Sequence, residues 1–309
     1  MKPLFILQLL FIYLPSDGRT FRCDYDYFKD INGYIKYQEI PANWREARLR
    51  CHLEGSKLAS PLNPGLRYAM LRYSNTSVCG VFTGLHSTFS RGDYFSVEGV
   101  PLARVPHTWT EGEPNNDKDK EGCIVMLSDG TFADVNCAET FPYLCYKKAA
   151  PNMFMSECGT SDTAYKLDRR TGSCYKFHQF PRTWSRAYMT CAAEGGYLAV
   201  INSDTEAKVL SELYTKMGVP IPYAGEYWTL VAHVGVHDWN EHGEWLTIHG
   251  DTIKDAGYDK FSPGEPNNSS SEFCGAIYRS GLFDDFWCER RAQFICEKDP
   301  EFLTCDHEQ

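Results

Sequence analysis

Two loops in this sequence carry oxygen-rich side chains at matching positions. Glu113-Pro114-Asn115 lies in the first half of the chain and Glu265-Pro266-Asn267 in the second, each ahead of two cysteines that are 14 residues apart. In both halves a Glu stands two residues before the first cysteine and an Asp three residues before the second. These acids are Glu121 and Asp134 in the first half, and Glu272 and Asp285 in the second. If each cysteine pair closes, the disulfide brings its acidic neighbours together beside the Glu-Pro-Asn loop.

Converging carboxylates of this kind need a cation. Several carboxylate and amide oxygens at one point repel one another unless a hard ion lies among them. Calcium suits such a set because it takes about six to eight oxygen ligands in loose geometry, whereas zinc prefers nitrogen and sulfur. A single Glu-Pro-Asn would indicate only a turn. Its repetition with the same acidic neighbours predicts a calcium site.

The matching loops belong to an internal repeat that covers most of the chain. At a shift of 140 residues, Trp44, Ala47 and Cys51 fall on Trp184, Ala187 and Cys191. At a shift of 151 residues the last three cysteines of the first copy fall on those of the second. The second copy therefore has eleven more residues in its middle, where loops tolerate insertion. Copies of this length are tandem domains, since solenoid units run to about 20–50 residues.

Each copy has the pattern of a mixed helix and strand domain. The repeated Trp, Ala and Cys are spaced i, i+3 and i+7, which is the buried stripe of an amphipathic helix. Ser203-Asp204-Thr205-Glu206 has the form of a capping box and predicts a further helix over Ala207 to Leu213. Short apolar runs predict strands at Val81–Leu85, Cys123–Leu127, Phe141–Tyr146 and Phe294–Cys296. Helices early and strands late in each copy indicate an α+β class.

The composition fits two such domains and disfavours some partners. A length of 309 residues corresponds to about two ordinary domains, and 43% hydrophobic residues support a core in each. Thirty-one basic and forty-one acidic residues give a net charge of -10, and no Lys/Arg block could form a phosphate-binding stripe. Nucleic acid and anionic bilayers are therefore poor partners, whereas a cation is a good one.

The N-terminus predicts a secretory signal peptide over residues 1–18. A basic start, an apolar run from Leu4 to Leu14, and the small residues Ser16 and Gly18 have the form of such a signal. No later stretch reaches the length and apolarity of a membrane span. A secreted chain meets an oxidising environment, so most of the thirteen cysteines should pair.

With these residues, each copy resembles the C-type lectin family, and the resemblance covers almost the whole mature chain. It implies two disulfide-bonded carbohydrate-recognition domains, at residues 19–147 and 158–299, each with two helices, antiparallel sheets and a long calcium-binding loop region. A linker at 148–157 joins them, and a tail follows at 300–309. The implied disulfides are Cys51–Cys145, Cys123–Cys137, Cys191–Cys296 and Cys274–Cys288, with Cys158–Cys174 as the extra N-terminal bridge of the family's long form.

The first domain resembles the family's short form, because Tyr34 stands where the second domain has Cys174. A short form followed by a long form is similar to the immulectins, the two-domain plasma lectins of moths. The stretches Arg48–Gly55 and Gly92–Leu102 are close to that group in particular. The resemblance implies a haemolymph protein that binds lipopolysaccharide or other microbial wall glycans and acts on the serine-protease cascade of melanisation.

The resemblance also assigns calcium and sugar ligands. The second domain has a full set, which is Glu265, Asn267, Glu272, Asp284 and Asp285. The first domain matches at Glu113, Asn115, Glu121 and Asp134, but Ala133 stands at the remaining position and offers no oxygen. We therefore expect the second domain to bind calcium more tightly. The order Glu then Asn resembles the mannose and glucose type, and Pro114 and Pro266 are expected to be cis.

Three cysteines stand outside these pairs. Cys23, Cys79 and Cys305 leave at least one thiol that is free or intermolecular. One arrangement is a Cys23–Cys79 bridge, with Cys305 in the tail linking two chains. Asn75-Thr76-Ser77 is an acceptor for N-glycans. A second acceptor begins at Asn267, where a glycan would occupy a predicted calcium ligand, so we expect modification at Asn75.

The sequence thus predicts a secreted, calcium-dependent lectin that recognises and agglutinates microbes, and not an enzyme. No acid, base or nucleophile constellation stands apart from the expected ligands. Two sites on one chain would turn weak single-site binding into avid binding on a repeating glycan. The alternative is a calcium-independent member of the same fold that binds a protein surface and no sugar. Calcium dependence and competition by sugars separate these two functions.

Overall fold

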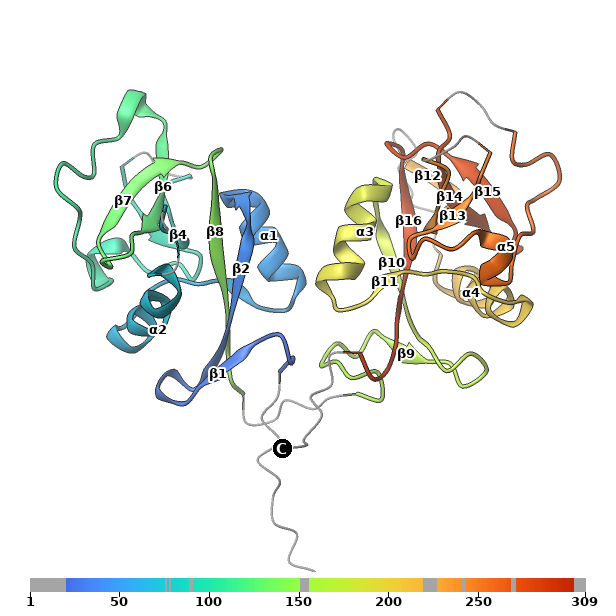
Figure 1. Cartoon of the computed structure of the whole chain (residues 1–309), viewed down its shortest axis with the longest axis horizontal. Helices are drawn as coiled ribbons and strands as arrows, with labels where there is room; N and C mark the ends of the chain where they lie inside the picture. The colour runs from blue at the N-terminus through green and yellow to red at the C-terminus, as the bar shows by residue number, and fades with distance from the viewer. Residues whose placement is uncertain are drawn as a thin grey trace, which may run out of the picture.

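The chain folds into two similar sheet-based domains that lie side by side (Figure 1). The computed structural model describes residues 21–75, 77, 79–88, 92–150, 156–218, 227–239, 243–267 and 271–302. The predicted signal peptide at 1–18 and Cys305 lie outside these residues. Within the described part, no helix is both long and apolar enough to cross a membrane.

Domain 1 is built on an eight-stranded sheet with the order β1-β2-β8-β4-β6-β7, in which β3 also pairs with β8 and β5 with β4. Its strands are β1 Asp26–Phe28, β2 Gly33–Asn43, β3 Lys57–Leu58, β4 Val81–His86, β5 Phe95–Ser96, β6 Glu121–Met126, β7 Phe132–Asn136 and β8 Thr140–Lys148. Its helices are α1 Trp44–Leu53, α2 Pro64–Ser74, and the short 3-10 turns η1 Lys29–Ile31, η2 Leu102–Arg104 and η3 Asp117–Asp119.

Domain 2 repeats this topology with the order β15-β14-β12-β16-β10-β9, in which β11 also pairs with β16 and β13 with β12. Its strands are β9 Lys166–Leu167, β10 Cys174–Arg182, β11 Tyr197–Leu198, β12 Tyr227–His237, β13 Leu246–Thr247, β14 Cys274–Tyr278, β15 Phe283–Phe286 and β16 Arg291–Lys298. Its helices are α3 Trp184–Ala193, α4 Asp204–Met217 and α5 Ile253–Ala256. The predicted α+β class with two tandem domains is confirmed. One pair in each sheet, β4–β8 and β12–β16, is parallel, in contrast to the antiparallel sheets expected.

The helices follow the local signals of the sequence. The Trp-Ala-Cys stripes of α1 and α3 are buried, as their spacing predicts. The Ser203 side chain accepts a hydrogen bond from the Glu206 backbone N–H, so Ser203 caps α4 as predicted. The Glu206 carboxylate accepts from the Asn202 N–H, one residue before the position that a capping box uses. Helix α2 is the second helix that the family resemblance implies for domain 1. Its local signals, Asn63 as the cap and Pro64 in the first turn, were not read from the sequence.

Disulfides join the elements that carry the acidic residues to the core. All five pairs implied by the family resemblance are bonded in the structure. The Cys23–Cys79 arrangement is wrong, because Cys79 is an exposed free thiol and Cys23 belongs to another disulfide. Cys23 precedes β1 at the sheet edge, whereas Cys79 precedes β4, three strand spacings away. At about 4.8 Å per strand this exceeds the roughly 7 Å that a disulfide spans between Cα atoms.

Domain 1 also has the N-terminal hairpin that the Cys158–Cys174 bridge closes in domain 2. Strands β1 and β2 correspond to β9 and β10, and Tyr34 stands at the position of Cys174. The buried Tyr34 ring lies 6.0 Å from the Phe21 ring and 5.1 Å from the Tyr27 ring, centroid to centroid. Aromatic packing therefore holds the hairpin of domain 1 in place of a disulfide.

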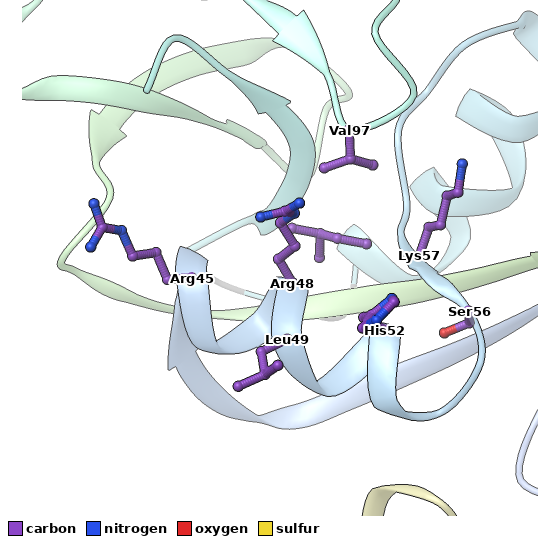
Figure 2. Close-up of a pocket in the computed structure, with 8 residues that line it drawn as sticks. Arg45, Arg48, Leu49, His52, Ser56, Lys57 and Val97 are labelled. Carbon is purple, nitrogen blue, oxygen red and sulfur yellow. The ribbon is translucent and has the colours of Figure 1, made fainter. Parts of the chain in front are cut away.

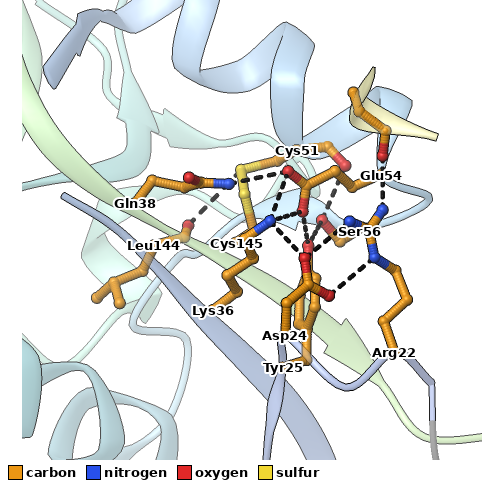
Figure 3. The surroundings of a disulfide bond; sticks show 11 residues. Arg22, Asp24, Tyr25, Lys36, Gln38, Cys51, Glu54, Ser56, Leu144 and Cys145 are labelled. Carbon is orange, nitrogen blue, oxygen red and sulfur yellow. Dashed lines mark hydrogen bonds and ion pairs between the residues drawn. A yellow bond between two sulfur atoms is a disulfide. The ribbon is translucent and has the colours of Figure 1, made fainter. Parts of the chain in front are cut away.

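The domains meet through α1 and α3, which face each other at the centre of Figure 1. Arg186 on α3 forms an ion pair with Glu46 on α1 at 2.6 Å. Arg22 pairs with Asp24 and donates to the Ala193 carbonyl at the end of α3, beside the Cys51–Cys145 disulfide of Figure 3. The long loops that precede β6 and β14 lie on the outer sides of the pair, away from this interface (Figure 1).

Candidate metal centres

The strand register places the two candidate centres at equivalent positions. In domain 2, Asp284 and Asp285 of β15 lie opposite Ala276 and Gly275 of β14. In domain 1, Ala133 and Asp134 of β7 lie opposite Val125 and Ile124 of β6. Counted from the cysteine that starts each arm, Ala133 therefore occupies the place of Asp284. The Cys123–Cys137 and Cys274–Cys288 disulfides close the two arms.

Both Glu-Pro-Asn loops have the same conformation. The Glu113–Pro114 and Glu265–Pro266 peptide bonds are cis. In domain 1 the Asn115 side-chain amide donates to the Glu113 carboxylate at 2.6 Å, and in domain 2 Asn267 donates to Glu265 at 2.7 Å. In each loop the Glu therefore presents acceptor oxygens next to an Asn amide that can both donate and accept.

Three carboxylates converge in domain 2. Glu265, Asp284 and Asp285 each offer an oxygen, and these oxygens lie within 4.8 Å of one another. Asp284 and Asp285 are buried, with 6% and 1% of their surface exposed. The Asn267 backbone N–H donates to Asp285 at 3.1 Å, and the Tyr278 hydroxyl donates to Asp284 at 3.0 Å. The structure thus brings four of the five predicted residues together.

Burial and mutual repulsion disfavour the ionised state of this group. Burial is the largest cause that raises the pKa of Asp284 to about 7, and the charges of Glu265, Asp285 and Glu272 add to it. Burial and a hydrogen bond shared with Asp285 also raise the pKa of Glu265. A cation among these oxygens would relieve both effects.

The fifth residue, Glu272, lies outside the close group but beside it. Its side chain is buried, and its Oε2 has no hydrogen-bond partner among the described residues. A buried carboxylate oxygen without a partner is costly unless a cation or another donor satisfies it. The oxygen-only donor set and this orphaned atom both fit calcium.

Domain 1 satisfies its carboxylates with its own donors. Glu113, Glu121 and Asp134 place oxygens within 4.8 Å of one another. The buried Asp134 carboxylate accepts three hydrogen bonds, from the backbone N–H groups of Asn115 and Asn116 and from the Tyr94 hydroxyl, each at 3.1 Å. A hydrogen bond to Asp134 is the largest cause that raises the pKa of Glu113. Protein donors thus occupy lone pairs that a cation would otherwise use.

Sequence reasoning missed three residues of these centres, which are Tyr94, Asn116 and Tyr278. Asn116 follows the Glu-Pro-Asn motif directly, adopts a positive φ of 45° and donates its N–H to Asp134. The other two are tyrosines whose hydroxyl groups reach the centres only through the folded strands. A polar residue beside a repeated motif was a usable signal for Asn116, whereas nothing local marks the tyrosines.

Comparison with known protein families matches two segments of the chain, one in each domain. The family model for the lectin C-type domain matches residues 40–147 and 180–298, which is well over half of the chain. The chain belongs to the C-type lectin domain family. Both matched segments contain a Glu-Pro-Asn loop and a complete β-arm, so both domains of this C-type lectin family member carry the elements described above.

Individual relatives cover parts of the chain. A hemolymph lipopolysaccharide-binding protein of Periplaneta americana is 34% identical over 125 residues, which is 40% of this chain and 48% of that protein. The C-type mannose receptor 2 of Rattus norvegicus is 25% identical over 305 residues, which is 92% of this chain and 18% of the receptor. The chain therefore spans about half or less of the length of these relatives. The particular relation to the moth immulectins stays a prediction.

Among solved structures, the carbohydrate-recognition domain of the mouse scavenger receptor C-type lectin is similar to one part of the chain. It is 24% identical, covers 44% of this chain and 94% of that domain, and has a TM-score of 0.37.

Proposed function

We propose that this protein is a calcium-dependent carbohydrate-binding lectin with domain 2 as its principal site. The observation that carries this proposal is the oxygen-only group of Glu265, Asp284 and Asp285, with the orphaned buried oxygen of Glu272 beside it. Glu265, Asn267, Glu272, Asp284 and Asp285 would hold the calcium ion. The bound ion would supply positive charge and open coordination positions for two sugar hydroxyls.

The Glu-Pro-Asn loop would orient the sugar. Glu265 accepts hydrogen bonds only, while the Asn267 amide can donate, so two neighbouring hydroxyls would meet an acceptor and a donor in a fixed order. This order supports the mannose and glucose type. Glu113 and Asn115 present the same pair in domain 1, where Glu121 and Asp134 would complete a weaker calcium site that lacks the Asp284 oxygen.

Two sites on one chain support a role in recognition and agglutination of microbes. Both loops lie on the outer sides of the domain pair, so one molecule can engage a repeating glycan twice (Figure 1). Similarity to a protein named for hemolymph and lipopolysaccharide supports secretion into haemolymph and microbial glycans as ligands. A serine-protease cascade downstream is implied by the resemblance to the immulectins alone. Asn75 is exposed at the end of α2, which supports it as the glycosylation site.

Retention of the full chain on mannan beads, with calcium or with a chelator, tests this proposal. We expect the chelator to release the wild type, and the double variant Glu265→Gln/Asn267→Asp to lose most of its retention. The matched variant Glu113→Gln/Asn115→Asp makes the same change in domain 1 and should lose less. Mannose should elute the wild type better than galactose does. Retention that ignores the chelator and both double variants would contradict the proposal and favour a protein-binding function.

A further inference from the structure

A hollow beside α1 in domain 1 is lined by basic side chains. Arg45, Arg48 and His52 project from one face of α1, and Lys57 lies across from them on β3 (Figure 2). We call these four residues the basic pocket. The hollow has a volume of about 250 Å³, and Leu49, Leu58 and Val97 supply apolar walls. Charged groups over an apolar floor suit a ligand that has both an anionic group and a carbon skeleton.

The four side chains of the basic pocket are free to meet a ligand. All four are exposed, and none has a hydrogen bond or an ion pair to any described residue. The neighbouring Arg50 differs, because it is committed to Glu46 in an ion pair at 3.2 Å. Burial is the largest cause that lowers the pKa of His86, and the positive charge of Arg48 lowers it further. An uncommitted cluster of this kind stands out in a chain with a net charge of -10.

The fold itself does not require these basic residues. The same helix and strand recur in domain 2, where the equivalent positions hold Ser185, Tyr188, Ala192 and Tyr197. None of these four is basic, yet α3 packs as α1 does. The basic pocket is therefore a feature of domain 1 alone.

Arg45 connects the basic pocket to the candidate metal centre of domain 1. It lines the basic pocket and also a second hollow, which includes Pro114, Asn116 and Glu121. An extended ligand can therefore run from the Glu-Pro-Asn loop over Arg45 into the basic pocket.

We propose that the basic pocket binds an oxyanion substituent, a phosphate or a carboxylate, of a glycan whose neutral sugars occupy the domain 1 site. This inference rests on the proposed sugar-binding function. Arginine presents a planar fork of donors that matches phosphate and carboxylate oxygens, and a lysine and a histidine nearby add further donors. The four basic residues are not adjacent in the sequence. Helical spacing on α1 and the position of β3 bring them together.

Binding of the full chain to three immobilised polymers tests the inference: mannan, phosphomannan and carboxymethyl mannan, all in calcium and without phosphate buffer. The variant Arg48→Glu/Lys57→Glu reverses two charges of the basic pocket. The matched control Lys166→Glu/Arg169→Glu reverses two exposed charges on domain 2. Thermal unfolding of each variant establishes that it is folded.

We expect the wild type to bind phosphomannan at least tenfold more tightly than mannan. Arg48→Glu/Lys57→Glu should remove this advantage and leave mannan binding within about twofold, while the control behaves as wild type. A matching gain on carboxymethyl mannan would identify any oxyanion as the ligand, and a gain on phosphomannan alone would identify phosphate. Equal wild-type binding to all three polymers, or equal losses in both variants, would overturn the inference.

Two results separate this inference from the proposed function. If mannan fails to bind but phosphomannan binds through Arg48 and Lys57, the neutral-sugar function is wrong and the basic pocket stands. If inorganic phosphate alone binds as tightly as phosphomannan, the glycan part of the inference is overturned.

Discussion

At the same point of the β-arm, domain 2 has Asp284 and domain 1 has Ala133, and their surroundings differ in the same sense. Tyr278 donates to Asp284, whereas the matching residue of domain 1 is Leu127. Ala133 and Leu127 pack against the apolar core of domain 1. A carboxylate and its supporting donor are therefore present together in one domain and absent together in the other.

The next carboxylate along the β-arm, Asp134 in domain 1 and Asp285 in domain 2, shows the reverse pattern. In domain 1 the Tyr94 hydroxyl donates to Asp134, and two backbone N–H groups complete its hydrogen bonds. In domain 2 the matching residue is Trp245, whose Nε1 has no partner within the described ranges. Domain 1 thus gives Asp134 a tyrosine hydroxyl donor at a position where domain 2 has a tryptophan. The same Glu-Pro-Asn motif therefore lies in two different electrostatic environments in the two domains.

Removal of the distinguishing carboxylate should have the largest effect. We expect Asp284→Ala to lower the calcium affinity of domain 2 by roughly a hundredfold, because loss of a residue that only supports a metal ligand already costs about 10–100-fold. Calorimetric titration of the full chain should then lose its tighter calcium site and keep the weaker one. An unchanged tight site would show that Asp284 is not a ligand.

A second acidic difference predicts a pH effect on stability. Glu206 and Glu297 are buried in domain 2, where domain 1 has Leu66 and Tyr146. Burial, with the charge of Glu206, raises the pKa of Glu297 from 4.5 to about 7. Unfolding therefore releases a proton between these pH values, so stability falls as the pH rises through that window.

In a buffer with a chelator, we expect Glu297→Gln to flatten this dependence. Relative to the variant, the wild type should lose about 1–3 kcal/mol in free energy of unfolding between pH 4.5 and pH 8. Urea unfolding at the two pH values measures it. Parallel pH profiles for the two proteins would refute the assignment.

A substitution that gives domain 1 the carboxylate of domain 2 should have an intermediate effect on stability. Ala133→Asp adds a carboxylate beside Leu127, which cannot donate a hydrogen bond, so the calcium-free protein should lose about 1–3 kcal/mol of stability. Calcium should restore that loss, and adding Leu127→Tyr should reduce it without calcium. Thermal unfolding with and without calcium measures both. If the Ala133→Asp variant is as stable as the wild type and does not respond to calcium, the stated difference between the two domains is wrong.

Removal of a single donor should have the smallest effect. Tyr94→Phe deletes the hydroxyl that donates to Asp134 and should lower the free energy of unfolding by about 1 kcal/mol. The matched Tyr278→Phe removes the donor to Asp284 in domain 2 and serves as the control. Urea unfolding in chelator compares the two, and no change in either would show that these hydroxyls are not needed.

Local features of the fold were predictable from the sequence. The Trp-Ala-Cys spacing predicts α1 and α3, the capping box predicts α4, and four apolar runs correspond to β4, β6, β8 and β16. These signals succeed because capping and amphipathic periodicity depend on residues within a few positions of one another. The two-domain repeat and the positions of the acidic residues are likewise properties of the sequence alone.

The tertiary structure decided which groups meet. Tyr94 reaches Asp134 across 40 residues, Cys79 is kept from Cys23 by two intervening strands, and Lys57 joins Arg48 across the basic pocket. Such contacts depend on strand register and on the packing of a helix against a sheet, which no local pattern encodes. The sequence therefore determined where the oxygen ligands stand, and only the fold decided which hydrogen-bond donors face them.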